Sequence, residues 1–173
     1  MKLDRQLQIL IEEAPQQGIS TLVVEKAVAP VLRAFASQLQ HLEYYVLQNR
    51  EGNWIVSAIA NIERPQQQKQ VIYSFPTVED ATHAQANFNL KLENVSVPVT
   101  HLLFQLFALE GIDSLIFLET PGNLEKGIEI ARTSLQKSIQ EQLQKLKNIP
   151  VPQSKTIPSN LAGNRSFGLS NLS

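Results

Sequence analysis

The chain has 173 residues, enough for one domain with a substantial core. With 43% hydrophobic residues, 18% charged residues and a net charge of −1, it has an ordinary globular composition and no electrostatic bias toward nucleic acid or an anionic membrane. It contains no cysteine, which excludes disulfides, thiolate catalysis and cysteine-ligated metals.

The N-terminal part of the chain predicts helices. Apolar residues over Leu3–Ile11 recur at helical spacing, and Pro15 with Gly18 ends that helix. A second periodic segment, Leu22–Leu39, contains Pro30, which would remove a backbone donor from a helix interior. We therefore expect a kink, or two short helices with Pro30 in the first turn of the second.

Three apolar runs separated by polar turns follow, and they predict a three-stranded antiparallel meander. The runs are Tyr44–Gln48, Trp54–Ile62 and Val71–Phe75. The middle run is partly apolar on both faces, as in a central strand that is covered on both sides. We expect Trp54 in the core.

The next segment predicts a helix, a connector and a second helix. Thr77 and Asp80 suit a helix N-terminus, and that helix should run to about Phe88. Residues 87–96 are less regular and could include a short edge strand. The helix from Val99 to Leu109 is apolar on nearly all sides, so it should lie in the core, with Phe104 and Phe107 buried, or in an oligomer interface.

The C-terminal part predicts a fourth strand at Asp113–Glu119, a turn at Thr120–Asn123 and a long helix at Leu124–Asn148. We thus expect an α+β fold in which an antiparallel sheet of about four strands packs against N-terminal helices and the long final helix. Residues 1–148 should form this single domain. Residues 149–173, rich in Pro, Ser and Asn, should form a flexible tail.

The titratable residues do not form a recognisable catalytic or metal-binding pattern. His41, His83 and His101 lie in three different elements without the spacing of metal ligands, and His41 is expected beside the carbonyls that end a helix. Glu119 ends a strand before a Pro-Gly turn, a position often used in catalysis. A single carboxylate is weak evidence, however, and Asp113 lies at the other end of that strand. We therefore predict a protein that is not an enzyme and has no cofactor or metal.

The turn at Thr120–Asn123 could hold an anion on its backbone amides, but one glycine favours an ordinary turn. The sequence contains no nucleophile elbow, dinucleotide-binding glycine motif or phosphate-binding loop. The aromatic residues of the three predicted strands could stack on RNA bases, but the basic residues that usually accompany such a surface are missing, so we expect them in the core.

Two features favour contact with another protein. A row of three glutamines runs beside the apolar stripe of the predicted final helix, and large apolar residues are spaced along the polar tail. The tail could be a docking peptide or an unused end. The candidate partner-binding residues are Gln136, Gln140, Gln144, Phe167, Leu169 and Leu172.

The sequence thus favours a non-enzymatic module for protein–protein interaction or assembly, with a protein partner or a second copy of the chain. The alternative is a small-ligand-binding protein, or an enzyme without a recognisable motif, that uses a pocket between the sheet and the helix at residues 99–109. The first residues do not resemble a secretory signal, and no apolar stretch is long enough for a membrane span. A cytoplasmic location without membrane insertion is therefore expected.

Overall fold

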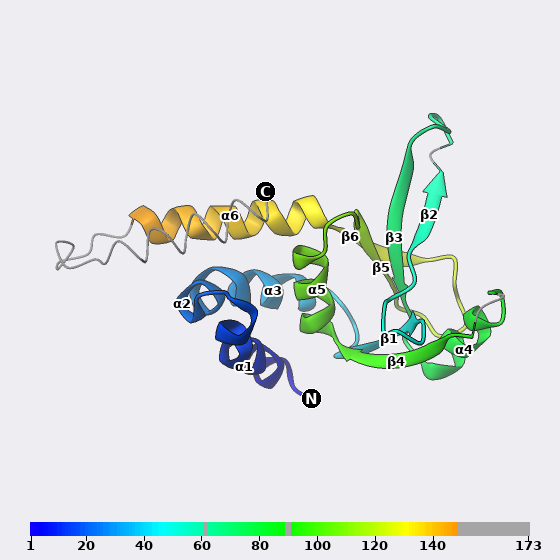
Figure 1. Cartoon of the computed structure of the whole chain (residues 1–173), viewed down its shortest axis with the longest axis horizontal. Coiled ribbons are helices and arrows are strands. Elements are labelled where there is room, and N and C mark those ends of the chain that lie inside the picture. The colour runs from blue at the N-terminus through cyan, green and yellow to red at the C-terminus, as the bar shows by residue number, and fades with distance from the viewer. Residues whose placement is uncertain (61, 89–90, 149–173) are drawn as a thin grey trace.

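The computed structural model describes residues 1–60, 62–88 and 91–148, which form a mixed α+β fold with two sheets (Figure 1). The helices are α1 (Leu3–Glu13), α2 (Thr21–Val23), α3 (Ala29–Ala36), α4 (Val78–Gln85), α5 (Val99–Ala108) and α6 (Arg132–Asn148). The strands are β1 (Glu43–Gln48), β2 (Ser57–Ala60), β3 (Gln68–Ser74), β4 (Glu93–Pro98), β5 (Ser114–Leu118) and β6 (Gly127–Ala131). Within the described ranges, no helix combines the length and the apolar content needed to cross a membrane.

Pro30 lies in the first turn of α3, which confirms the second of the two predicted arrangements. A proline lacks a backbone N–H to donate, so it fits where the hydrogen-bond pattern changes from the π-helical turn to α3. A π-helical turn, Val24–Val28, joins α2 directly to α3. The segment therefore changes its helical geometry at the proline without a loop.

The larger sheet has the strand order β2-β3-β5-β6. Its central pair, β3 and β5, is parallel with Val71 opposite Ser114, whereas the outer pairs are antiparallel. The second sheet pairs β1 with β4 in antiparallel register. The prediction of a single antiparallel sheet is therefore wrong.

The predicted three-stranded meander is also wrong, because β1 is not a ladder partner of β2. Gln48 of β1 forms an isolated bridge with Trp54, and the chain then continues away from β1 to pair with β3. The β1 strand pairs instead with β4, from the segment where a short edge strand was expected. The sequence pattern predicted where these strands lie along the chain, but it did not predict which strands pair with one another.

The final helix begins later than predicted. Residues 127–131 form β6 against β5, and α6 starts at Arg132. Gly127 suits this close pairing, since a Cβ on it would lie 2.8 Å from the carbonyl oxygen of Phe117. Pairing with β5 thus overrides the helical spacing that continues through Leu124 and Ile128, whereas Leu135, Ile139 and Leu143 are buried on α6 as predicted.

Two hydrophobic clusters cover the two faces of the larger sheet. The main cluster joins α1, α3, α5 and α6 to one face, and it contains Phe104 and Phe107 as predicted. A smaller cluster beneath α4 covers part of the opposite face. Trp54 is only half-buried at the border of the main cluster, so the expectation that it lies in the core is wrong.

A buried glutamine ties the helices to the smaller sheet. The Gln6 side chain is 1% exposed. Its Nε2 donates to the carbonyl oxygens of Met1 (3.0 Å) and Leu42 (2.8 Å). Its Oε1 accepts from the backbone N (3.1 Å) and Oγ1 (2.9 Å) of Thr100 at the start of α5. Every hydrogen-bonding position of this amide is used, so one side chain links α1, α5 and the segment that enters β1.

We expect Gln6→Ala to lower the free energy of unfolding by about 2–4 kcal/mol, because it leaves buried donors and an acceptor without partners. Gln8→Ala on the same helix is the matched control. Gln8 is exposed and bonds only to Glu12, and its replacement should cost less than about 0.5 kcal/mol. Urea denaturation of both variants measures the difference, and equal midpoints would contradict the role given to Gln6.

Candidate functional site

Residues 54–57, which lead into β2, lie between two hollows that open on opposite faces of the β2–β3 hairpin. Successive side chains of a strand point to opposite faces. Ser57 and Tyr73 therefore face one side, and Val56 and Ile72 face the other. The hairpin projects away from the helices (Figure 1).

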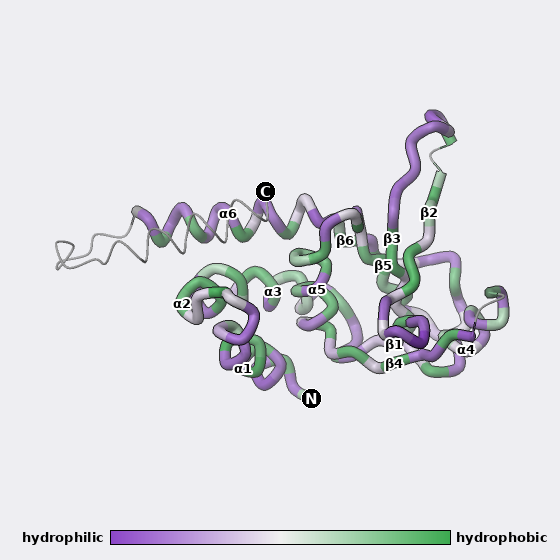
Figure 2. Tube along the Cα trace, viewed as in Figure 1, coloured by the Kyte–Doolittle hydropathy of each residue, from purple (hydrophilic) through white to green (hydrophobic). Residues whose placement is uncertain are grey.

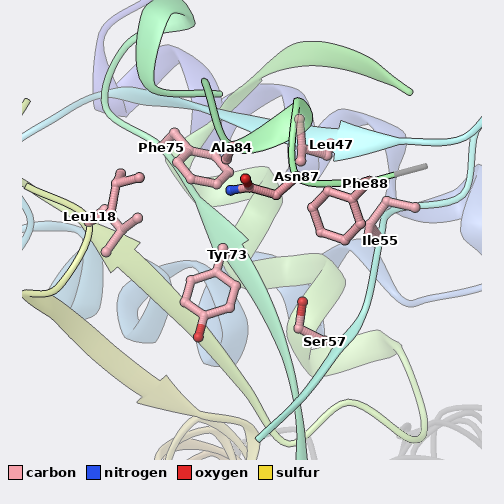
Figure 3. Close-up of a pocket in the computed structure, with 10 residues that line it drawn as sticks. Leu47, Ile55, Ser57, Tyr73, Phe75, Ala84, Asn87, Phe88 and Leu118 are labelled. Atoms are coloured by element: carbon pink, nitrogen blue, oxygen red, sulfur yellow. The ribbon is translucent and has the colours of Figure 1, made fainter. Parts of the chain in front are cut away.

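The first hollow, which we call the Tyr73 hollow, has a volume of about 260 Å³. Figure 3 shows aliphatic and aromatic groups around it, with the hydroxyls of Tyr73 and Ser57 on one side and the amide of Asn87 on another. Its volume is below the usual range for small-molecule sites, and its polar groups do not converge on one point. Its wall comprises Leu47, Ile55, Ser57, Tyr73, Phe75, Ala84, Asn87, Phe88, Leu118 and Leu124.

The second hollow, the Trp54 hollow, has a volume of about 430 Å³. It lies between the hairpin and the C-terminal end of α5, in the region where the alternative hypothesis places a ligand pocket. Trp54, Val56 and Ile72 line it from the hairpin side, and Gln105 and Leu109 line it from α5. Trp54 is the only tryptophan of the chain, so tryptophan fluorescence reports on the surroundings of this one side chain, which include the hollow.

The β2 strand is an edge strand without the usual protective residues. In the described part of the chain it has a strand neighbour on one side only, and residues 54–60 contain neither charge nor proline. By contrast, β6 carries Glu129, and β4 carries Glu93 and Pro98. Charge and proline on an edge strand prevent another strand from adding to it, so β2 is open to such pairing.

Glu119 forms a buried cluster at the other end of the larger sheet. The carboxylate is 7% exposed, and it accepts hydrogen bonds from the hydroxyl of Tyr44 and from the backbone N of Gln40 at 2.7 Å. His41 Nε2 lies 3.0 Å from the carbonyl oxygen of Glu119, so His41 does not serve the helix carbonyls that were expected. Burial, followed by the hydrogen bond and charge of Glu119, raises the pKa of Tyr44 far above its ordinary value.

The turn after Glu119 is fixed by a second carboxylate. Gly122 has φ +80°, and its backbone N donates to both carboxylate oxygens of Asp80 at 3.1 Å. This amide is therefore already bonded within the protein, which favours the ordinary-turn interpretation over the anion site. Together the two carboxylates attach the end of β5 to β1 and α4, so we interpret them as structural.

Removing the Tyr44 hydroxyl tests that interpretation. Tyr44→Phe leaves one oxygen of a buried carboxylate without its donor, so the free energy of unfolding should fall by about 1–3 kcal/mol. Tyr73→Phe is the matched control, because the half-buried Tyr73 lies at the wall of an open hollow and water can replace its contacts. A melting temperature lowered by both variants to the same extent would contradict a special role for the Tyr44–Glu119 bond.

The structure keeps the three histidines apart. His41 belongs to the Glu119 cluster, His83 is exposed on α4, and His101 is half-buried at the start of α5. Within the described residues, no group bonds the buried Nε2 of His101, and no three histidine or carboxylate side chains are placed to hold a metal ion. Burial lowers the pKa of His101 below its ordinary value of 6.5, with Glu13 opposing the shift through its charge.

This shift predicts a dependence of stability on pH. His101 has a lower pKa in the folded state than in the unfolded state, so the unfolded state binds its proton more readily. The contribution of His101 to stability is therefore complete at a pH above the unfolded pKa of about 6.5. It is lost as the pH falls through the lower, folded pKa. The urea midpoint should therefore fall between pH 7.5 and pH 5. His101→Gln should flatten that dependence, and His83→Gln should leave it unchanged. A wild-type slope in His101→Gln would assign the dependence to other groups.

Of the candidate partner-binding residues, the three glutamines lie in the described part of the chain. Gln136 and Gln140 are half-buried along the border of the α6 packing face, and Gln144 is exposed. The apolar stripe beside them packs within the domain, so the row borders an internal contact. Phe167, Leu169 and Leu172 lie outside the described residues. Comparison with models of protein families gives no match, and comparison with characterised proteins finds no relative.

Proposed function

We propose that this chain is a non-enzymatic module for protein–protein interaction or assembly, and that the β2–β3 hairpin is its contact surface. The observation that carries the proposal is the apolar surface left uncovered around the hairpin. Val56 is 43% exposed and Leu109 is 37% exposed at the mouth of the Trp54 hollow, and Ile62 near the tip is 97% exposed.

Isolated exposed apolar residues are common on proteins, but Val56 and Leu109 lie together at the Trp54 hollow, and such a pairing of exposed apolar side chains at a hollow is typical of a binding surface. Figure 2 shows β2 mostly in the hydrophobic colour, whereas the tip of the hairpin is mostly hydrophilic. This apolar surface and the projection of the hairpin support contact with another macromolecule. The predicted glutamine row and tail remain additional candidate contacts.

A second candidate function is the binding of a small apolar ligand in the Trp54 hollow. Its volume of about 430 Å³ falls within the usual range for such sites. The amide of Gln105 and the carboxylate of Glu110 in its wall could orient a ligand.

Affinity purification of the tagged full chain tests the first function. We expect specific proteins to co-purify, and the double variant Val56→Ser/Leu109→Ser to reduce their amount at least fivefold, because it removes apolar surface from the hairpin region. Leu22→Ser is the matched control, since Leu22 is also exposed but lies on α2. Partners retained equally by all variants would place the contact elsewhere.

Trp54 fluorescence separates the two functions. A small-molecule extract that shifts the Trp54 emission maximum of the wild-type chain, with the shift lost in Gln105→Ala, would favour the ligand-binding function. An unchanged spectrum together with specific co-purifying proteins would favour the interaction module.

A further inference from the structure

We infer that the open edge of β2 takes an extended, uncharged segment of another protein as an added strand, with its apolar side chains alternating between the Tyr73 hollow and the Trp54 hollow. This inference rests on the proposed interaction function and names its site and the chemistry of the partner.

The position of the hollows carries the geometric argument. They open on opposite faces of the hairpin and share residues 54–57, the segment that leads into β2, as a common wall: Ile55 and Ser57 line one hollow, and Trp54 and Val56 line the other. A helix or a flat surface docked on either face would reach one hollow only. A strand paired with β2 presents successive side chains to both faces, so an extended segment can use both.

The charges indicate the composition of the partner. Residues 54–60 carry no charge and the wall of the Tyr73 hollow is uncharged, so a charged side chain laid along β2 or placed in that hollow would lose water without gaining an opposite charge. The nearby Lys69 is already paired, with its Nζ 2.8 Å from Glu129 Oε2. Bonds from Lys69 and Ser114 lower the pKa of Glu129, which keeps it ionised. The complementary segment is therefore uncharged where it lies along β2.

The shortness of the β2 edge limits how much of the binding affinity can come from backbone hydrogen bonds. Four residues of β2 span about 13 Å and can form only a few backbone hydrogen bonds with a neighbour. Side chains that enter the two hollows must therefore provide most of the affinity and the specificity. The preferred ligand has apolar residues at every second position on each face.

Selection from a displayed library of random nine-residue peptides, with the full-length chain as bait, tests the inference. We expect the enriched peptides to have an uncharged core with alternating residue sizes. Ala58→Lys should weaken their binding at least tenfold, because a lysine on an edge strand opposes strand addition. Ala34→Lys, at an exposed position of α3, is the matched control and should bind as the wild type does.

Hydrogen exchange checks the mode of binding. Ala58 is exposed, so Ala58→Lys should keep the wild-type circular dichroism, and Ala60→Lys provides a second variant if it does not. Bound peptide should slow exchange at the backbone amides of residues 57–60. Enriched peptides with helical spacing, peptides that bind both lysine variants as tightly as the wild type, or unchanged exchange in β2 would overturn the inference.

Other occupants give distinct results that would also overturn it. A dimer of the wild-type chain that Ala58→Lys dissociates would make a second copy the occupant. If the amides of residues 57–60 are protected from hydrogen exchange without added peptide, and the double variant Phe167→Ser/Leu169→Ser loses this protection, the occupant is the chain's own C-terminal segment. If the same proteins co-purify with wild type and with Ala58→Lys, the interaction function stands but the β2 edge is not its site. If no protein co-purifies with the wild-type chain, the interaction function itself is contradicted.

Discussion

The parallel pairing of β3 with β5 is the constraint on which the rest of the fold depends. Parallel neighbours cannot be joined by a tight turn, so the chain between them must cross over one face of the sheet. Here that connection contains α4, β4 and α5. The two helices of this connection lie against opposite faces of the larger sheet: α5 belongs to the main hydrophobic cluster and α4 to the smaller one. The pairing of β3 with β5 therefore positions both clusters.

The crossover also determines what happens at β2. The β4 strand lies within the connection and forms a ladder with one edge of β1, while the other edge of β1 reaches the larger sheet only through isolated bridges to Trp54 and Phe75 among the described residues. In a simple meander β2 would have strands on both sides, which matches the apolar character of both its faces. Instead, among the residues that the structure describes, β3 is its one ladder partner. A strand whose residues are apolar on both faces, as in a central strand, thus lies at the edge of the sheet. The two hollows lie on its two faces, where no other element in the described part of the chain covers the sheet.

Local signals in the sequence predicted most of the elements, because such signals depend on neighbouring residues, but they missed β6. Thr77 accepts a hydrogen bond from the backbone N of Asp80 at the start of α4, and the apolar helix α5 is buried. Strand pairing depends on distant residues and was not predictable in the same way. Tyr44 and Glu119 are separated by 75 positions, and neither has a local feature that indicates the other. Glu119 at the end of β5 was considered only as a weak catalytic candidate, and its bonds to Tyr44 and Gln40 emerged only from the three-dimensional contacts.

The packing of α6 against the π-helical turn at Val24–Val28 has a consequence for synthesis of the protein. The first helices reach their final covering only when residues 132–148 are available, more than 100 positions later. At a translation rate of roughly 5–20 residues per second, this interval lasts on the order of 5–20 s. During it, the apolar faces of α3 and of the π-helical turn lack one of their partners. A growing chain is therefore a candidate client for ribosome-associated chaperones until its last helix has emerged.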